Sequence, residues 1–409
     1  MILKNFLIRK FFLFFLYLII IIYLSETLLY FYLPNEQKNL VDINKRRIEI
    51  AKKNNLNFDS RHGITAYLEE RKKNADLSIP FYFNKTDFSL GVTQERIIKN
   101  QLIPFRGPIN KQILSCNEDL KYKLINNDKY GFKNPNSVYD RKIKIALIGD
   151  SYAEGLCEDE TNDIAGHLRK INYNTINLGV SGSGPLVSLG IVREYLSKLD
   201  PDFVVYLYFE GNDLNDLNWE KKTYLLNYLD PNYKINYLKK YNEIEQFLEN
   251  HQKEIVKEIE NFDLNDYSKK NRNSFNEILK DLLEISNIKG ILRSSFSNSD
   301  KKIDLDLFYE VLQSIDYEVR QNGSKLIFVY LPTWSRYYTK FNKDKFIYNK
   351  KKEILDYLNK NHIHYIDFEK ILSNTKNKEN FFPLGFVGHY NSKGYEKISN
   401  LIKDSIENN

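Results

Sequence analysis

The stretch IALIGDSYAEG, from Ile145 to Gly155, decides the fold because it reads as a buried strand that ends at a serine. Its apolar residues run into Gly149, Asp150 and Ser151, and the small and acidic residues that follow can open a helix. In open α/β sheets, ligands bind beyond the carboxyl ends of the strands. Ser151 is therefore either a helix N-cap or a nucleophile at the ligand-binding edge of a sheet.

The chain after Lys142 alternates short apolar runs with longer amphipathic stretches. The predicted strands are IKIALIGD, NTINLGV, DFVVYLYF, SKLIFVYLP and HIHYIDF, and the predicted helices include Ile191–Leu199, Asp306–Gln321 and Asp344–Asn359. Strands that alternate with helices predict a parallel sheet covered on both faces. The strands contain few polar residues, as expected when both of their sides are buried.

Two regions do not follow this alternation. From about residue 217 to 300 the sequence contains only charged helical stretches, so we expect a helical insertion. It either walls a substrate site or forms a solvated hairpin. Residues 34–141 predict a stalk and a lead segment of strands and loops against the main domain, which spans 142–405.

The amino terminus predicts a membrane anchor. Basic residues within 1–10 precede an apolar stretch at 11–33, which is long enough to cross ~30 Å of hydrocarbon as a helix. Bulky residues occupy the place of a small-x-small cleavage site, which favours an uncleaved anchor over a signal peptide. The compact basic cluster predicts a cytoplasmic amino terminus, with the bulk of the chain outside the cytoplasm, periplasmic in a Gram-negative cell. In such a cell we expect this helix to attach the protein to the inner membrane.

Charge and cysteine content narrow the functional classes. The 60 Lys and Arg residues exceed the 54 Asp and Glu residues by only 6, and the two kinds are interspersed, so we expect no nucleic-acid partner. Cys116 and Cys157 could form one disulfide in an oxidising compartment or remain two buried free thiols.

Further polar groups follow the next predicted strands. The second strand ends in NLGVSGSGP, which contains Gly182, and the third ends in EGND, which contains Asn212. His389 lies in GHYNSKGYEKI, before the last predicted helix. A serine, backbone donors, an amide and a histidine at one sheet edge are the groups that acyl transfer needs.

These blocks resemble the SGNH (GDSL-like) hydrolase superfamily. GDSYAEG (149–155), NLGVSGSG (177–184), GND (211–213) and GHYNSKGY (388–395) occur in the family's order and cover roughly residues 142–405 without the insertion. The resemblance implies a flavodoxin-like three-layer α/β/α sandwich with a parallel sheet. With the anchor, the layout also resembles membrane-tethered enzymes of bacterial surface carbohydrates.

The resemblance also implies the site residues. Ser151 would be the nucleophile and His389 the general base, while the N–H groups of Ser151 and Gly182 and the Asn212 amide would form the oxyanion hole. No cofactor or metal is expected, because His362 and His364 have no accompanying ligand pattern.

One position departs from the family pattern. The family carries an Asp three residues before the histidine, and here that residue is Phe386. A backbone carbonyl or a distant carboxylate could orient His389, the enzyme could use a Ser–His dyad, or the domain could be a degenerate binding module.

The resulting expectation is a serine esterase or O-acyltransferase. It would remove or transfer an acyl (acetyl) group on an extracytoplasmic glycan through an acyl-Ser151 intermediate. The alternatives are a catalytically degenerate glycan-binding or assembly subunit and a lipid esterase or thioesterase.

Overall fold

A computed structural model describes the protein over residues 2–32, 40–80, 104–261, 283–285, 288–289, 304–338 and 350–408. The chain divides into two units, one containing residues 1–39 and 261–302 and the other containing residues 40–260 and 303–409. The second unit carries the predicted sheet.

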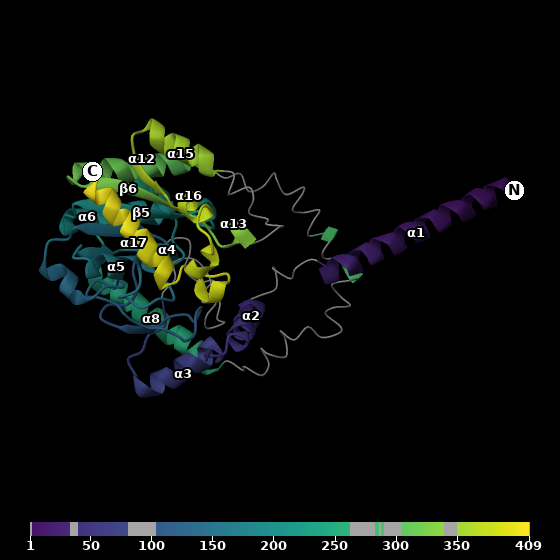
Figure 1. Ribbon diagram of the computed structural model, residues 1–409, viewed down its shortest axis with the longest axis horizontal. Helices are drawn as coiled ribbons and strands as arrows, with labels where there is room; N and C mark the ends of the chain where they lie inside the picture. Colours follow the sequence, from purple (N-terminus) through teal and green to yellow (C-terminus); the bar gives the residue numbers. More distant parts are fainter. Residues whose placement is uncertain are drawn as a thin grey trace. The chain divides into compact units, whose positions relative to one another are not determined.

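The centre of this unit is a parallel sheet of five strands in the described residues (Figure 1). The strands are β3 (Ile145–Gly149), β4 (Thr175–Asn177), β5 (Phe203–Phe209), β6 (Lys325–Leu331) and β7 (His364–Asp367). Their spatial order is β4-β3-β5-β6-β7, and every neighbouring pair is parallel. Counted along the sheet-forming part of the chain, this is the 2-1-3-4-5 order of flavodoxin-like folds. The predicted fold class is confirmed.

Helices cover both faces of the sheet because successive strand residues point to opposite sides. Along β5, Tyr206 and Tyr208 join the core beneath one set of helices, whereas Val205 and Leu207 join the core beneath the other. The first set is α6 (Pro185–Leu199), α12 (Leu305–Gln321) and α15 (Lys351–Lys360); the second is α5 (Ile164–Lys170), α16 (Phe368–Ser373) and α17 (Ser392–Glu407).

The predicted insertion is only partly a separate element. It overlaps α7 (Asp213–Glu220), η2 (Tyr224–Leu229) and α8 (Tyr241–Glu260). Tyr228 and Leu248 are buried in the same core as α6, so the portion up to residue 260 packs on the domain. Most of 261–302 lies outside the described residues, as does the beginning of the helix predicted over Asp344–Asn359.

The lead segment belongs to the same unit as the sheet. It contains α2 (Leu40–Lys53), α3 (Gly63–Lys73), an antiparallel pair β1 (Gln112–Leu114) and β2 (Leu124–Asn126), and η1 (Asn136–Asp140). Phe105 and Phe132 enter the core beneath α6. The Lys133 ammonium group bonds the carbonyl oxygens of Gly155 and Glu158 at 2.7 and 2.8 Å, which ties this segment to the chain leaving β3.

The other unit contains α1 (Ile2–Tyr32). Its stretch Arg9–Leu28 is long and apolar enough to cross a membrane. The side chains of this stretch are mostly exposed, as expected of a surface that faces lipid rather than a protein core. Residue 33, the end of the predicted span, lies outside the described residues.

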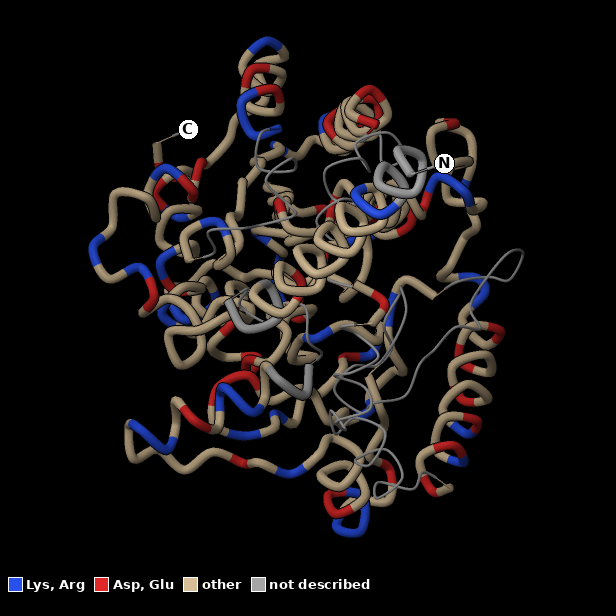
Figure 2. Tube along the Cα trace, turned by 90° about the vertical axis from the view of Figure 1, so that its right-hand side faces the viewer, with Lys and Arg blue, Asp and Glu red and all other residues tan. Residues whose placement is uncertain are grey.

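Charged residues of both signs are interspersed along the trace (Figure 2). The same mixture of charges in the sequence is the reason why we expect no nucleic-acid partner. The absence of such a partner stays a prediction.

Candidate active site

Ser151 is the first residue of α4 (Ser151–Glu154), at the carboxyl end of β3. Gly149 turns the chain there with a φ of 140°, and an added Cβ would lie 2.5 Å from the carbonyl oxygen of Leu207. Glycine therefore lets the strand pass close to β5 and turn sharply into the serine. Asp150 is the N-cap, and its carboxylate accepts the N–H of Tyr152 at 2.9 Å. The N-cap is thus Asp150, which leaves the Ser151 hydroxyl for another role.

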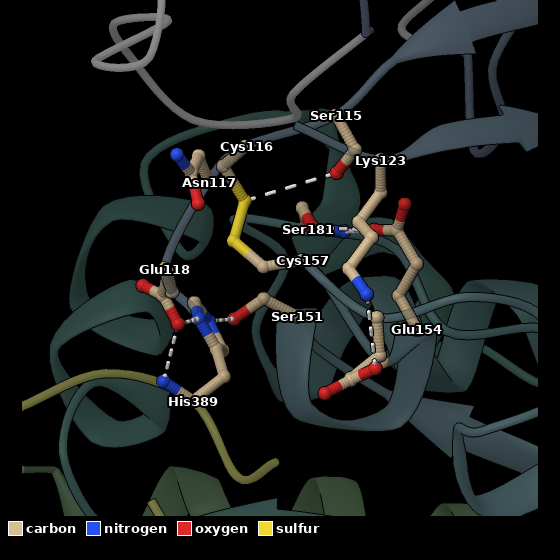
Figure 3. The surroundings of a disulfide bond; sticks show 12 residues. Ser115, Cys116, Asn117, Glu118, Lys123, Ser151, Glu154, Cys157, Ser181 and His389 are labelled. Carbon is tan, nitrogen blue, oxygen red and sulfur yellow. Dashed lines mark hydrogen bonds and ion pairs between the residues drawn. A yellow bond between two sulfur atoms is a disulfide. The ribbon is translucent and has the colours of Figure 1, made fainter. Parts of the chain in front are cut away.

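His389 lies beside Ser151. It comes from the loop between η5 (Pro383–Gly385) and α17, and its Nε2 is 2.9 Å from the Ser151 Oγ (Figure 3). The structure brings together two residues that are 238 positions apart in the sequence. A base within hydrogen-bond distance of a hydroxyl can take its proton as that hydroxyl attacks.

The third member of the cluster is Glu118, which the sequence analysis missed. It lies between β1 and β2, in the lead segment, and its Oε2 is 3.0 Å from the His389 Nδ1 and accepts the His389 backbone N–H at 2.7 Å. Figure 3 shows Glu118 and Ser151 on either side of the imidazole. A distant carboxylate therefore fills the place left open at Phe386, whose ring instead packs edge-on against Trp334 at 5.4 Å.

The charges of the pair stabilise each other. Burial alone would lower the pKa of His389, but the charge and hydrogen bond of Glu118 outweigh it and raise this pKa. Burial would likewise raise the pKa of Glu118, and the charges of His389 and Arg47 lower it instead to about 2. Glu118 is therefore an anion at neutral pH and can stabilise a positive charge on His389.

Asp150 is not the orienting acid. Its Oδ2 is 3.5 Å from the Ser151 Oγ, at the limit of hydrogen bonding, and burial raises the pKa of its carboxyl to about 6. Its contacts are those of a helix cap, as expected for the residue before a helix.

The predicted oxyanion donors follow three adjacent strands of the sheet, β4, β3 and β5. Gly182 lies between β4 and α6, and the N–H groups of Ser151 and Gly182 have no acceptor within the described residues. Asn212 follows β5 at the N-cap position of α7 without a side-chain cap bond, and its Nδ2 donates to Asp216 Oδ2 at 2.6 Å. A hydrogen bond from Asn212 also lowers the pKa of Asp150. The amide is thus held near Ser151 by carboxylates, and its donation to a substrate oxygen stays a prediction.

Helix α7 also holds the glycine loop. The buried Glu220 carboxylate accepts the N–H groups of Gly184 and Leu186 at 2.6 and 2.8 Å, and burial raises its pKa to about 7. Gly184 has no side chain with which to cap α6, so Glu220 supplies the cap from another helix. Asn212, Asp216 and Glu220 are spaced four residues apart and so share one face of α7.

A disulfide joins Cys116 to Cys157 across 41 positions of the sequence (Figure 3). Cys116 is two residues before Glu118, and Cys157 is six residues after Ser151. The bond therefore fastens the segment that carries the acid to the segment that carries the serine. The remaining candidates, His362 and His364, lie at β7, where the His364 Nε2 is 2.6 Å from the Ser405 Oγ.

Removing this disulfide is expected to destabilise the protein. Closing a loop of this length stabilises a fold by ~4 kcal/mol through the entropy of the unfolded chain. We therefore expect the double variant Cys116→Ala/Cys157→Ala to unfold at a lower temperature than the full-length wild type in the same detergent. Added reductant should lower the wild-type midpoint and leave that of the variant unchanged. Equal midpoints for the two oxidised proteins would contradict this.

Comparisons with known proteins give similar structures but no family. No protein-family model and no curated protein matches the sequence. Among solved structures, the chain is similar to a lipolytic protein of the G-D-S-L family from Desulfitobacterium hafniense (12% identity, TM-score 0.36, 64% of this chain and 99% of that one). It is also similar to a GDSL-like lipase from Bacteroides thetaiotaomicron (14%, 0.35, 66% and 90%) and to a catalytic mutant of an acetylxylan esterase from Geobacillus stearothermophilus (11%, 0.35, 64% and 93%). These scores are low, so the fold and the site rest on the topology and contacts given above.

Proposed function

We propose that the protein is a serine esterase or O-acyltransferase that works through an acyl-Ser151 intermediate. The observation that carries the proposal is the chain of contacts from Ser151 Oγ to His389 Nε2 and from His389 Nδ1 to Glu118 Oε2, at 2.9 and 3.0 Å. A nucleophile, a base and an acid that orients the base form the arrangement that activates a serine for attack on an acyl carbonyl.

The reaction follows from this geometry. The Ser151 Oγ attacks the carbonyl carbon of the ester while its proton moves to the His389 Nε2, and Glu118 stabilises the imidazolium. Collapse of the tetrahedral intermediate breaks the ester bond, and the same proton passes to the leaving alcohol. Water or a second alcohol then attacks the acyl-enzyme while His389 takes its proton, and collapse of the second tetrahedral intermediate breaks the acyl–Ser151 bond and returns that proton to the Ser151 Oγ. Water gives hydrolysis, and a sugar hydroxyl gives acyl transfer.

The substrate that we propose is an acylated glycan outside the cytoplasm. The disulfide supports an oxidising compartment, and α1 supports attachment to a membrane. The glycan itself rests on the resemblance of the sequence to membrane-tethered enzymes of surface carbohydrates. The alternative of a degenerate binding module was favoured by the absence of an Asp three residues before His389. Because Glu118 contacts His389 in place of that Asp, this reason no longer applies.

Acetate release from different substrates tests the proposal. The full-length protein in detergent is given an acetylated polysaccharide, a small acetyl ester or a phospholipid, each with Ser151→Ala as the control. We expect Ser151-dependent acetate release from the first two substrates. If the protein is a transferase, we also expect an acetylated sugar when a free sugar is added as acceptor. Release of fatty acid from the phospholipid alone would contradict the glycan assignment.

The oxyanion assignment predicts the effect of Asn212→Ala. Charge develops on the carbonyl oxygen during attack, and removing one donor to it costs on the order of 10²–10³ in turnover. We expect a fall of that size in kcat on a small acetyl ester, with an unchanged melting temperature. Asn215→Ala, on the same helix, is the control. If the kcat of Asn212→Ala is within twofold of the wild type, the Asn212 amide donates only to Asp216 and Asp150 and not to the substrate.

A further inference from the structure

Helix α2 places one charged side chain, Arg47, inside the domain, and its Arg46 guanidinium lies 5.8 Å from the centre of the Phe386 ring. Of its residues whose side chains are described, only Arg47 and Ala51 are buried. The Arg47 Nη2 lies 3.2 Å from the Glu118 Oε1 and donates to the carbonyl oxygen of Val387 at 3.0 Å. The guanidinium therefore contacts both the orienting acid and the loop that carries His389.

The contacts divide the two oxygens of Glu118 between two partners. Oε1 faces Arg47, whereas Oε2 accepts the backbone N–H of His389 and contacts its Nδ1. The same Nη2 contacts Oε1 and donates to the Val387 carbonyl oxygen, and Nη1 donates to the carbonyl oxygen of Asn117 at 3.4 Å, so three partners fix the planar guanidinium. Arg47 thus holds Oε1 and leaves Oε2 to His389.

The histidine loop is held at three consecutive residues. The carbonyl oxygen of Val387 accepts from Arg47, that of Gly388 accepts from the Tyr152 hydroxyl at 3.2 Å, and the His389 N–H donates to Glu118. A Cβ on Gly388 would lie 2.8 Å from the Glu118 Oε2, so only glycine leaves room for this approach. Three segments of the chain therefore converge on the loop, and α2 supplies one of them.

We propose that Arg47 is a positioning residue of the active site, which holds Glu118 and Val387 so that Glu118 faces the imidazole. The inference rests on the proposed serine mechanism and adds α2 to the parts that the mechanism needs. Arg47 also keeps Glu118 ionised, because its charge and that of His389 outweigh the effect of burial on the carboxyl. The site is complete only when α2 is docked.

A double-mutant cycle tests this role in the full-length protein. The variants are Arg47→Met, Glu118→Gln and their combination, with Lys45→Met, an exposed neighbour on α2, as the matched control. We expect Arg47→Met to lower kcat on a small acetyl ester by about 10- to 100-fold, with KM within about twofold. The combined variant should be no slower than Glu118→Gln alone, because Arg47 acts through Glu118. Lys45→Met should match the wild type.

The pH profile separates positioning from a merely structural role. The Arg47 charge itself lowers the pKa of His389 and Asp150 raises it, so the profile is read in Arg47→Lys, which keeps both charges. If Glu118 loses its hold on His389 there, burial again lowers the pKa of the imidazole, and the acid limb of kcat/KM moves to lower pH, as in Glu118→Gln. Losses that multiply in the combined variant, or an unmoved acid limb in Arg47→Lys, would overturn the inference. Should Arg47→Met fail to fold, Arg47→Lys answers the same questions, because a lysine keeps the charge but not the fork.

The failure of this inference can be told from the failure of the proposed function. If the turnover of the wild type equals that of Ser151→Ala, the proposed function itself is wrong. If turnover depends on Ser151 but is the same in the wild type and in Arg47→Met, only the proposed role of Arg47 is wrong.

Discussion

Replacing Ser151 or His389 with alanine is expected to lower the turnover of a small acetyl ester by about 10⁴–10⁶-fold, the largest effect of any single substitution here. Without Ser151 there is no oxygen to carry the acyl group, and without His389 the hydroxyl keeps its proton at neutral pH. The two side chains are 2.9 Å apart and act on the same proton. The double variant should therefore be no slower than either single variant.

The measurement is initial-rate kinetics on full-length protein above the uncatalysed rate. We expect both variants to keep the wild-type melting temperature, because Ser151 and His389 are each partly exposed and their removal leaves no large cavity. An unchanged melting temperature would show that the variant folds. A Ser151→Ala variant that retains wild-type turnover would contradict the mechanism.

Glu118→Gln is expected to lower kcat by about 10²–10⁴-fold, because an amide can neither stabilise the imidazolium nor fix the tautomer of His389. The pH dependence should change as well. Glu118 raises the pKa of His389 against the opposing effect of burial, so its loss lowers that pKa. The acid limb of kcat/KM requires a neutral His389, and we expect it to move to lower pH.

Asp119→Asn is the matched control for this variant. Asp119 is the next residue in the same loop and makes no contact with His389 in the structure. Its loss should leave both kcat and the acid limb unchanged. A Glu118→Gln variant with the wild-type profile would show that the backbone, rather than the carboxylate, orients the histidine.

The fold could be predicted because each strand carries its own local signal. The runs that became β3, β5 and β6 are apolar on both sides, and each ends in turn residues. Ser151 and His389 could be found for the same reason, since they lie in short motifs at the ends of elements. The docking of α8 could not, because Ile244 and Leu248 indicate an apolar helix face but not what it packs against.

Glu118 could not be found from its own surroundings. It lies 271 positions from His389, in a loop with other charged residues, and nothing in CNEDLKYK distinguishes it from a solvated carboxylate. The only signal was indirect. A bond between Cys116 and Cys157 brings position 118 close to Ser151, and a carboxylate there could replace the acid missing at Phe386. Arg47 carried no such signal, because α2 reads as a polar helix.

The most direct test of the central claim is the trapping of Ser151 with a serine-directed phosphonate. The full-length protein is labelled and its peptides are mapped by mass spectrometry, with Ser151→Ala as the control. We predict one adduct, on Ser151, that forms much more slowly in His389→Ala and is absent from the control. Labelling at another residue, or none in a folded wild type, would contradict the assignment of Ser151 as the nucleophile.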